Sequence, residues 1–138
     1  DAEDTEDTSD TEDSDETDDP VDPNAIEVFG GYINQGNEHY FGETTYSIKY
    51  GPGETYTYVY VQFSNQQRWL VAQNGSMNYG EEGLFSRFDW NIDSSGQVWL
   101  CHTTNNAESD VEAQNTPAAN AFNTASGCDG GPWMQLIG

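Results

Sequence analysis

The chain has very little positive charge. Of its 138 residues, 3 are Lys or Arg and 25 are Asp or Glu, which gives a formal net charge of −22. Contacts to phosphate need Lys and Arg side chains, so this balance excludes nucleic acid as a partner and argues equally against anionic lipid headgroups. It favours solubility, cations and basic partners.

Long apolar runs and the usual catalytic motifs are absent too. No stretch approaches the roughly 18 apolar residues of a membrane-spanning helix, and there is no phosphate-binding loop or dinucleotide fingerprint. His39 and His102 have no Gly-x-Ser-x-Gly motif with which to form a triad. Glu81 and Glu82 are adjacent in a glycine-flanked turn, unlike the spaced carboxylates of glycosidases. We therefore expect no enzyme and no cofactor.

Only two cysteines are present, Cys101 and Cys128. Neither belongs to a C-x-x-C pair, and His102 has no partner at ligand spacing, so a zinc site is excluded. The chain has one Lys and is rich in Asn, Gln, Gly, Ser, Thr and Tyr, a composition typical of secreted β-proteins. An even cysteine count in an exported chain favours one disulfide between Cys101 and Cys128, with two free buried thiols as the alternative.

The first twenty residues hold twelve acids and no base, in Asp-led triplets. They cannot bury enough apolar surface to offset their ordering entropy, which predicts a disordered acidic stalk. Carboxylates suit calcium, but residues 1–20 contain no Gly, which an EF-hand loop requires. The prediction is therefore no specific metal site, with calcium at most held diffusely along the triplets that begin at Asp1, Asp4, Asp7, Asp10 and Asp13.

The change in composition near Pro20 and Pro23 divides the chain into a stalk or linker, residues 1–23, and a single β-rich globular domain, residues 24–138. Because the sequence begins at Asp1 without Met, we expect a mature or trimmed form. An acidic Asp/Thr/Ser stalk is typical of the segment that follows a bacterial lipoprotein cysteine. This predicts a lipid anchor upstream of Asp1 and an exported protein at the outer cell surface.

Short β-prone segments separated by turn residues dominate the globular part. Helix-forming residues at 105–119 predict one short helix near the C-terminus, capped at Asn105 or Asn106. The fold class is all-β: six to eight strands in a small antiparallel meander, closed as a barrel or folded as a sandwich. The expected strands are residues 25–33, 39–50, 55–63, 67–73, 84–91, 97–102 and 132–137.

The strand at 55–63 has the sequence TYTYVYVQF and therefore two distinct faces. Val59 and Val61 lie on one, which we expect to be the core. Tyr56, Tyr58 and Tyr60 lie on the other, which is either a platform for a ligand or a set of cross-strand pairs that stabilise the sheet.

Two further residues are candidates for ligand contact. Trp133 follows Gly130-Gly131-Pro132, and of the four tryptophans it is the one we expect to be partly exposed. Arg68 precedes Trp69 and either makes a structural contact or anchors a ligand carboxylate. Arg87 shares strand parity with Asp89, so an ion pair or a cation–π contact is expected there.

Four spaced motifs carry a family resemblance: LVAQN at 70–74, SRFDW at 86–90, WLC at 99–101 and GCDGGPW at 127–133, with an acidic helix between the last two. This cadence resembles small β-domains of exported, lipoprotein-like proteins of deltaproteobacterial-type bacteria. The resemblance implies export, the disulfide and the stalk, and it implies no activity. The start at Gly30-Gly31-Tyr32 also resembles the opening strand of lipocalin-like barrels, although those carry Gly-x-Trp and this chain has no Trp there.

These observations predict an extracellular, surface-tethered, non-enzymatic module on an acidic spacer that binds a glycan, a peptide or a small ligand. The alternative is a structural subunit of an extracellular fibre or surface layer. Such a subunit would self-assemble through strand edges or the N-terminal segment, with or without calcium.

Overall fold

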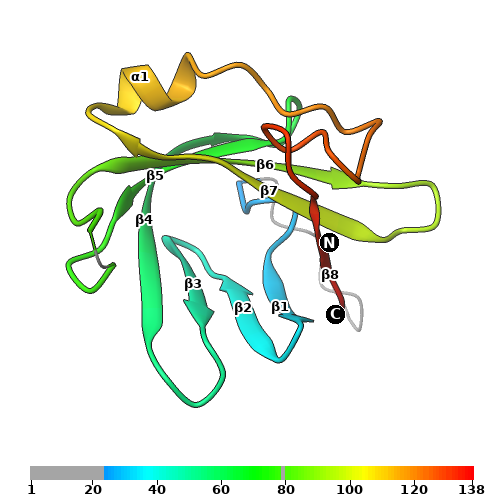
Figure 1. Ribbon diagram of the computed structural model, residues 1–138, viewed down its shortest axis with the longest axis horizontal. Helices are drawn as coiled ribbons and strands as arrows, with labels where there is room; N and C mark the ends of the chain where they lie inside the picture. The colour runs from blue at the N-terminus through cyan, green and yellow to red at the C-terminus, as the bar shows by residue number, and fades with distance from the viewer. Residues whose placement is uncertain (1–23, 79) are drawn as a thin grey trace, which may run out of the picture.

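The computed structural model describes residues 24–78 and 80–138, and it is an all-β fold. Eight antiparallel strands pair in sequence order, and an isolated bridge between Ile33 and Ile137 joins the first strand to the C-terminal segment, so the sheet curls into a nearly closed barrel (Figure 1). The predicted meander is confirmed, and of its two forms the barrel is observed. The strands are β1 (Gly30–Asn34), β2 (Asn37–Phe41), β3 (Thr45–Lys49), β4 (Thr55–Ser64), β5 (Trp69–Asn74), β6 (Phe85–Ile92), β7 (Val98–Ala107) and β8 (Met134–Leu136).

Tight turns set the register of the hairpins. Gln35 and Gly36 between β1 and β2 have φ values of 51° and 84°, the left-handed conformation that a two-residue hairpin turn requires. The single strand expected at 39–50 is wrong, because the chain reverses after Phe41 and forms β2 and β3. There the amide of Gly42 donates to the carbonyl of Thr45 at 2.8 Å.

One end of the barrel is covered by the segment before β1. The side chain of Asn65, in the β4–β5 turn, donates to the carbonyl of Ala25 and accepts from the amide of Glu27, both at 2.8 Å. This places the side chains of Ile26 and Val28 in the core. The prediction of one strand over residues 25–33 is therefore wrong in its first half. Residues 25–29 instead form this cover, which we call the plug.

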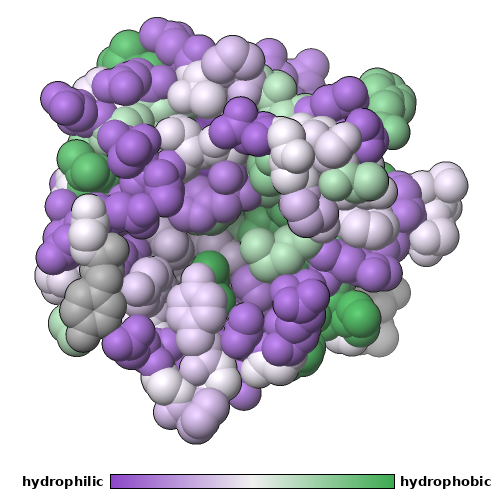
Figure 2. Space-filling view, in the orientation of Figure 1, coloured by the Kyte–Doolittle hydropathy of each residue, from purple (hydrophilic) through white to green (hydrophobic). Residues whose placement is uncertain are grey.

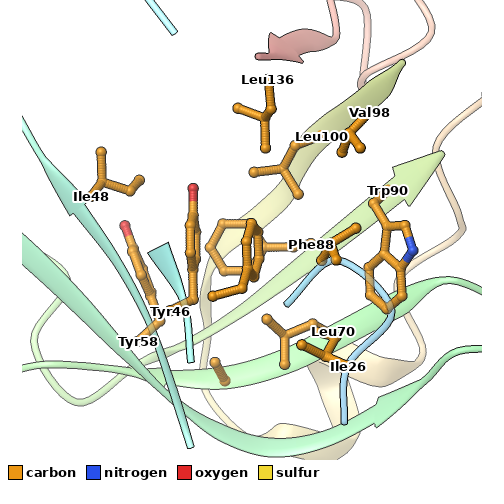
Figure 3. Packing of buried hydrophobic residues seen from close by; sticks show 13 residues of the cluster. Ile26, Tyr46, Ile48, Tyr58, Leu70, Phe88, Trp90, Val98, Leu100 and Leu136 are labelled. Atoms are coloured by element: carbon orange, nitrogen blue, oxygen red, sulfur yellow. The ribbon is translucent and has the colours of Figure 1, made fainter. Parts of the chain in front are cut away.

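The barrel interior is filled mainly by aromatic and branched side chains (Figure 3). The rings of Phe41 and Tyr46 stack with centroids 4.1 Å apart, and Phe88 meets Tyr46 edge-on at 5.0 Å. Such stacked and edge-to-face pairs add to the stability that burial of their area provides. The buried cluster consists of Ile26, Val28, Phe41, Tyr46, Ile48, Tyr58, Leu70, Ala72, Phe88, Trp90, Val98, Leu100 and Leu136.

A second, smaller cluster lies outside the barrel wall, under helix α1 (Asp110–Gln114). Ala113 of α1 packs there with Trp69, Val71 and Ala107 of β5 and β7. The helix begins after Ser109, whose hydroxyl accepts from the amide of Glu112 at 3.1 Å. One short helix is thus confirmed.

The position expected for the helix cap is wrong. Asn105 and Asn106 belong to the end of β7, which pairs with β6 as far as Ala107.

Cys101 on β7 and Cys128 in the segment before β8 form a disulfide, as predicted. The bond ties the segment between α1 and β8 to the barrel wall. Within the described residues, no helix has the length and apolar character needed to cross a membrane. The stalk, its calcium prediction and the linker lie outside the described residues.

Candidate functional site

The tyrosine face of β4 turns inward, so the expected assignment of its two faces is wrong. Tyr58 is 2% exposed and belongs to the core cluster, and Tyr56 and Tyr60 pack against that cluster. Val59 and Val61, expected inside, are 48% and 45% exposed on the outer wall.

The pairing with β3 explains this orientation. On β3, Tyr46 lies opposite Tyr58 and Thr45 lies opposite Val59. Because Tyr46 is more apolar than Thr45, the face that carries Tyr46 and Tyr58 turns to the interior. A β-bulge between Tyr60 and Gln62 then shifts the register. Of the two readings of the tyrosines, packing against the core and across strands is what the structure shows, since an exposed platform needs accessible rings.

Both arginines are engaged within the protein. Nε and Nη2 of Arg68 donate to the two carboxylate oxygens of Glu27 at 2.9 and 3.1 Å. The first of these oxygens also accepts from Nε1 of Trp90 at 2.9 Å. Arg68 therefore joins the plug to the wall, and the contact is the structural one of the two that the sequence leaves open.

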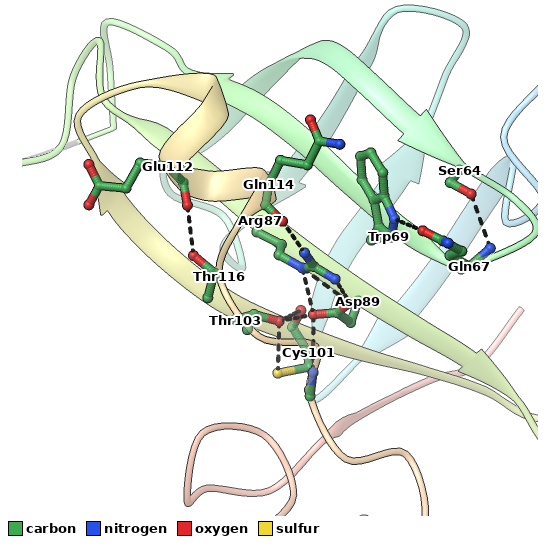
Figure 4. Close-up of polar contacts among 11 residues, drawn as sticks. Ser64, Gln67, Trp69, Arg87, Asp89, Cys101, Thr103, Glu112, Gln114 and Thr116 are labelled. Atoms are coloured by element: carbon green, nitrogen blue, oxygen red, sulfur yellow. Dashed lines mark hydrogen bonds and ion pairs between the residues drawn. The ribbon is translucent and has the colours of Figure 1, made fainter.

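Arg87 makes both contacts expected of it. Its Nη2 lies 2.9 Å from a carboxylate oxygen of Asp89, and its guanidinium lies 5.6 Å from the centroid of the Trp69 ring. Figure 4 shows that it also donates to the carbonyl of Gln114, the last residue of α1. This buried pair fastens the helix to the barrel.

Trp133 is more buried than expected, with 5% of its surface exposed. Its Nε1 donates to the carbonyl of Asn120 at 2.9 Å, and its amide donates to the carbonyl of Thr124 at 2.8 Å. These bonds, together with the disulfide, fix the segment that leads into β8. Although buried, Trp133 lines a cavity.

This cavity has a volume of about 630 Å³ and lies where the β1–β2 turn meets β7 and β8. Figure 2 shows that this face of the molecule is hollowed and that apolar side chains lie inside the hollow. The volume falls within the range of small-molecule sites. Its lining residues are Asn34, Gln35, Trp99, Leu100, His102, Cys128, Pro132, Trp133, Met134, Gln135 and Ile137.

The lining combines apolar surface with uncharged polar groups. Leu100, Trp133, Met134 and Ile137 supply the apolar part, and the amides of Asn34, Gln35 and Gln135 supply much of the polar part. Among the lining residues that the structure describes, none is Asp, Glu, Lys or Arg. In residues 24–78 and 80–138, no group of three His, Cys, Asp or Glu side chains is placed to hold a metal ion. The cavity therefore suits an uncharged, partly apolar molecule.

His102 is the one titratable side chain in the described part of the lining. Its ring stacks on Phe88 with centroids 4.2 Å apart and meets Tyr58 edge-on at 5.5 Å. Burial lowers the pKa of His102 to about 4, because the charged imidazolium is poorly solvated there. The ring is therefore neutral at physiological pH.

A chain of hydrogen bonds continues from His102 into the protein. Its Nε2 lies 2.8 Å from Oγ of Ser86, which in turn lies 2.6 Å from Oδ1 of Asn74. Ser86 is fully buried, so its hydroxyl is not accessible to a substrate as a nucleophile would be. The arrangement is a positioning network for the imidazole.

Of the sequence candidates, the structure places Trp133 alone at the cavity, and it keeps Arg68 and the tyrosine stripe elsewhere. The sequence interpretation missed His102 as a site residue. A signal was available, since His102 shares parity with Val98 and Leu100, which face the core. A histidine on an apolar strand face is a polar group within a largely apolar environment.

Comparisons with known proteins give no information on this site. No protein family model matches the chain, and no curated protein and no solved structure is significantly similar to it.

Proposed function

We propose that this domain is a non-enzymatic binding module that takes a small, uncharged ligand into the cavity between the β1–β2 turn, β7 and β8. The observation that carries the proposal is the cavity itself: about 630 Å³, apolar in part, and without a charged side chain among its described lining residues, in a chain of net charge −22. Small-ligand sites are concave, mostly apolar, and carry a few placed polar groups.

The barrel supports this use because the parts around the cavity are held in place. The plug, with Ile26 and Val28, packs into the core, and the disulfide fixes Cys128, one of the lining residues, to β7. A rigid wall around a preformed cavity lowers the entropic cost of binding a ligand. Of the glycan, peptide and small-ligand classes, the volume of about 630 Å³ favours the small ligand.

Export completes the proposal. A disulfide between Cys101 and Cys128 is typical of oxidising compartments, and the acidic segment 1–23 would hold the barrel away from a cell surface. A lipid anchor upstream of Asp1 belongs to the same proposal.

The assembly alternative has less support. Docking through strand edges requires free edges, whereas the amide and carbonyl of Ile33 exchange bonds with those of Ile137 at 2.7 and 3.0 Å. The side chain of Asn34 also donates to the carbonyl of Gln135 at 2.8 Å. Light scattering after size exclusion, with and without millimolar calcium, tests the alternative: a strictly monomeric protein in both conditions contradicts it.

The uncharged fluorescent dye N-phenyl-1-naphthylamine tests the binding site. We expect its fluorescence to rise with protein concentration and to saturate at one dye per chain. The variant Met134→Trp narrows the cavity and should weaken binding at least tenfold. Val59→Trp adds the same ring on the exposed outer wall of β4 and should leave binding unchanged.

Two results would contradict the proposal: no saturable binding to the wild type, or equal binding by wild type and Met134→Trp. Near-ultraviolet circular dichroism of each variant, which reports the packing of the aromatic core, establishes that the barrel is folded before its binding is compared.

A further inference from the structure

The protonation state of each nitrogen of His102 follows from the hydrogen bonds around it. The amide nitrogen Nδ2 of Asn74 lies 2.9 Å from two carbonyl oxygens, those of Glu81 and Asn105. An amide oxygen placed there would face two acceptors with no hydrogen between them, so the orientation of this amide is fixed. Oδ1 of Asn74 must therefore be the atom that faces Ser86.

The hydroxyl of Ser86 then has one role open to it. Because Oδ1 of Asn74 accepts only, the Ser86 hydroxyl donates its single hydrogen to that oxygen, over 2.6 Å. Oγ of Ser86 is left as an acceptor toward Nε2 of His102, at 2.8 Å. Nε2 must carry a hydrogen to complete the chain, and a neutral imidazole with a hydrogen on Nε2 has a bare lone pair on Nδ1.

Nδ1 of His102 has no hydrogen-bond partner among those found in residues 24–78 and 80–138. The side chain is half-buried and lines the cavity. Phe88 stacks on the ring, and Nε2 is directed at the buried Ser86. The polar group that the ring can offer to the cavity is therefore Nδ1, an acceptor without a donor.

We propose that His102 determines the specificity of the cavity, and that its unprotonated Nδ1 accepts a hydrogen bond from a hydroxyl or N–H group of the ligand. The inference rests on the proposed function, because it names the ligand class for the same cavity. That class is a neutral molecule with an apolar body and a single hydrogen-bond donor. The low pKa of His102, caused by burial, keeps Nδ1 unprotonated across the physiological range.

The charges of the protein also favour a neutral ligand over an anionic one. Within residues 24–78 and 80–138, the cavity lining includes no Lys or Arg to pair with an anion, and the chain as a whole is strongly negative. A carboxylate ligand would lose its hydration without gaining a partner, and its oxygens would face the lone pair of Nδ1. A hydroxyl in the same place gains a bond that the empty cavity lacks.

Four ligands of nearly one size test this specificity by displacing N-phenyl-1-naphthylamine at pH 7. 1-Naphthol carries a donor, 1-methoxynaphthalene and naphthalene carry none, and 1-naphthoate is charged. We expect 1-naphthol to bind about five- to tenfold more tightly than 1-methoxynaphthalene, the ratio that one neutral hydrogen bond supplies. We expect 1-naphthoate to bind most weakly.

Variants of His102 assign the preference to this side chain. His102→Phe keeps the ring on Phe88 and removes the acceptor, so 1-naphthol and 1-methoxynaphthalene should bind equally while naphthalene binds as before. His102→Gln keeps a donor for Ser86 and an acceptor for the ligand, and it should retain part of the preference. Long-range ¹H–¹⁵N NMR of the wild type should show hydrogen on Nε2 and none on Nδ1.

The outcomes separate the two proposals. If 1-naphthol and 1-methoxynaphthalene displace the dye equally well, or if NMR finds the hydrogen on Nδ1, the role of His102 is overturned and the binding module stands. If His102→Phe keeps the full preference for 1-naphthol, another side chain is the acceptor and the inference is again overturned. If none of the uncharged ligands displaces the dye, the proposed function fails and the inference fails with it.

Discussion

The guanidinium of Arg87 and the carboxylate of Asp89 pair side by side on the outer face of β6, two positions apart, with Nη2 and Oδ1 2.9 Å from each other. Both side chains are nearly buried, at 6% and 5% exposure. Asp89 also accepts from the hydroxyl of Thr103, and Arg87 donates to the carbonyl of Gln114 at 2.7 Å (Figure 4). The pair therefore connects β6, β7 and the end of α1.

Removing one partner should be costly because the other charge stays buried. We expect Asp89→Ala to lower the free energy of unfolding by about 3–5 kcal/mol, as for other buried pairs that lose one member. Glu82→Ala, in an exposed turn, is the control and should change it by less than about 0.5 kcal/mol. Urea denaturation followed by tryptophan fluorescence measures both, and a loss below about 1 kcal/mol for Asp89→Ala would show that the pair behaves as a surface pair.

The disulfide should contribute stability on a similar scale. Cys101 and Cys128 are separated by 27 positions, and closing a loop of that length stabilises a fold by about 3–4 kcal/mol on the chain-entropy model. We expect the double variant Cys101→Ala/Cys128→Ala to lose about that amount while far-ultraviolet circular dichroism retains the β spectrum. Unchanged urea unfolding in the double variant would contradict this role.

The inward orientation of the β4 tyrosines makes a prediction that the opposite orientation would reverse. Tyr58→Ala should open a cavity between Tyr46 and Phe88 and cost about 3–5 kcal/mol. Val59→Ala removes a half-exposed side chain one position away and should cost less than about 1 kcal/mol. Thermal unfolding of both variants compares them directly, and a larger loss for Val59→Ala would mean that the valines face the core.

The sequence predicts the fold class and the disulfide, but it does not predict features that depend on which strands lie side by side. The disulfide and the meander follow from residue types and the spacing of turn residues, and the sequence predicts both. It does not predict the orientation of β4, because TYTYVYVQF is apolar on both faces and its orientation depends on the strand beside it: Tyr46 opposite Tyr58 and Thr45 opposite Val59. The cavity was missed for the same reason, since Asn34, His102 and Met134 lie far apart in the sequence and meet through barrel closure.

Gly127 holds the segment before β8 in a shape that no other residue fits. A Cβ atom there would lie 2.1 Å from the carbonyl oxygen of Asn120 and 2.4 Å from that of Asn123. Gly127→Ala should therefore displace the segment, lower thermal stability, and weaken dye binding through the loss of the Trp133 contact to Asn120. Gly131→Ala, where a Cβ atom would lie 3.5 Å from the carbonyl oxygen of Cys128, is the matched control and should bind dye normally. Equal behaviour of the two variants would contradict the close approach.

The two histidines predict how stability depends on pH. Burial lowers the pKa of His102 from its usual 6.5 to about 4, and burial also lowers the pKa of His39. Between about pH 4 and pH 6.5, His102 binds more protons in the unfolded chain than in the folded one, so the free energy of unfolding rises with pH. The contribution of His102 to the free energy of unfolding is complete above about pH 6.5, is lost progressively as the pH falls to about 4, and amounts to about 3 kcal/mol.

The surroundings of His102 separate this effect from other titrations. Among the described residues, Tyr58 and Phe88 make ring contacts with His102 and Ser86 makes its hydrogen bond. Of these three, Tyr58 is the one that titrates, and burial raises its pKa far above this range. Urea midpoints measured from pH 7 to pH 4.5 should therefore fall steeply for the wild type. They should fall much less for His102→Phe, in which His39 is the remaining histidine. Parallel curves for the two proteins would show that His102 is as readily protonated in the folded state as in the unfolded one, and would contradict its burial as a neutral acceptor.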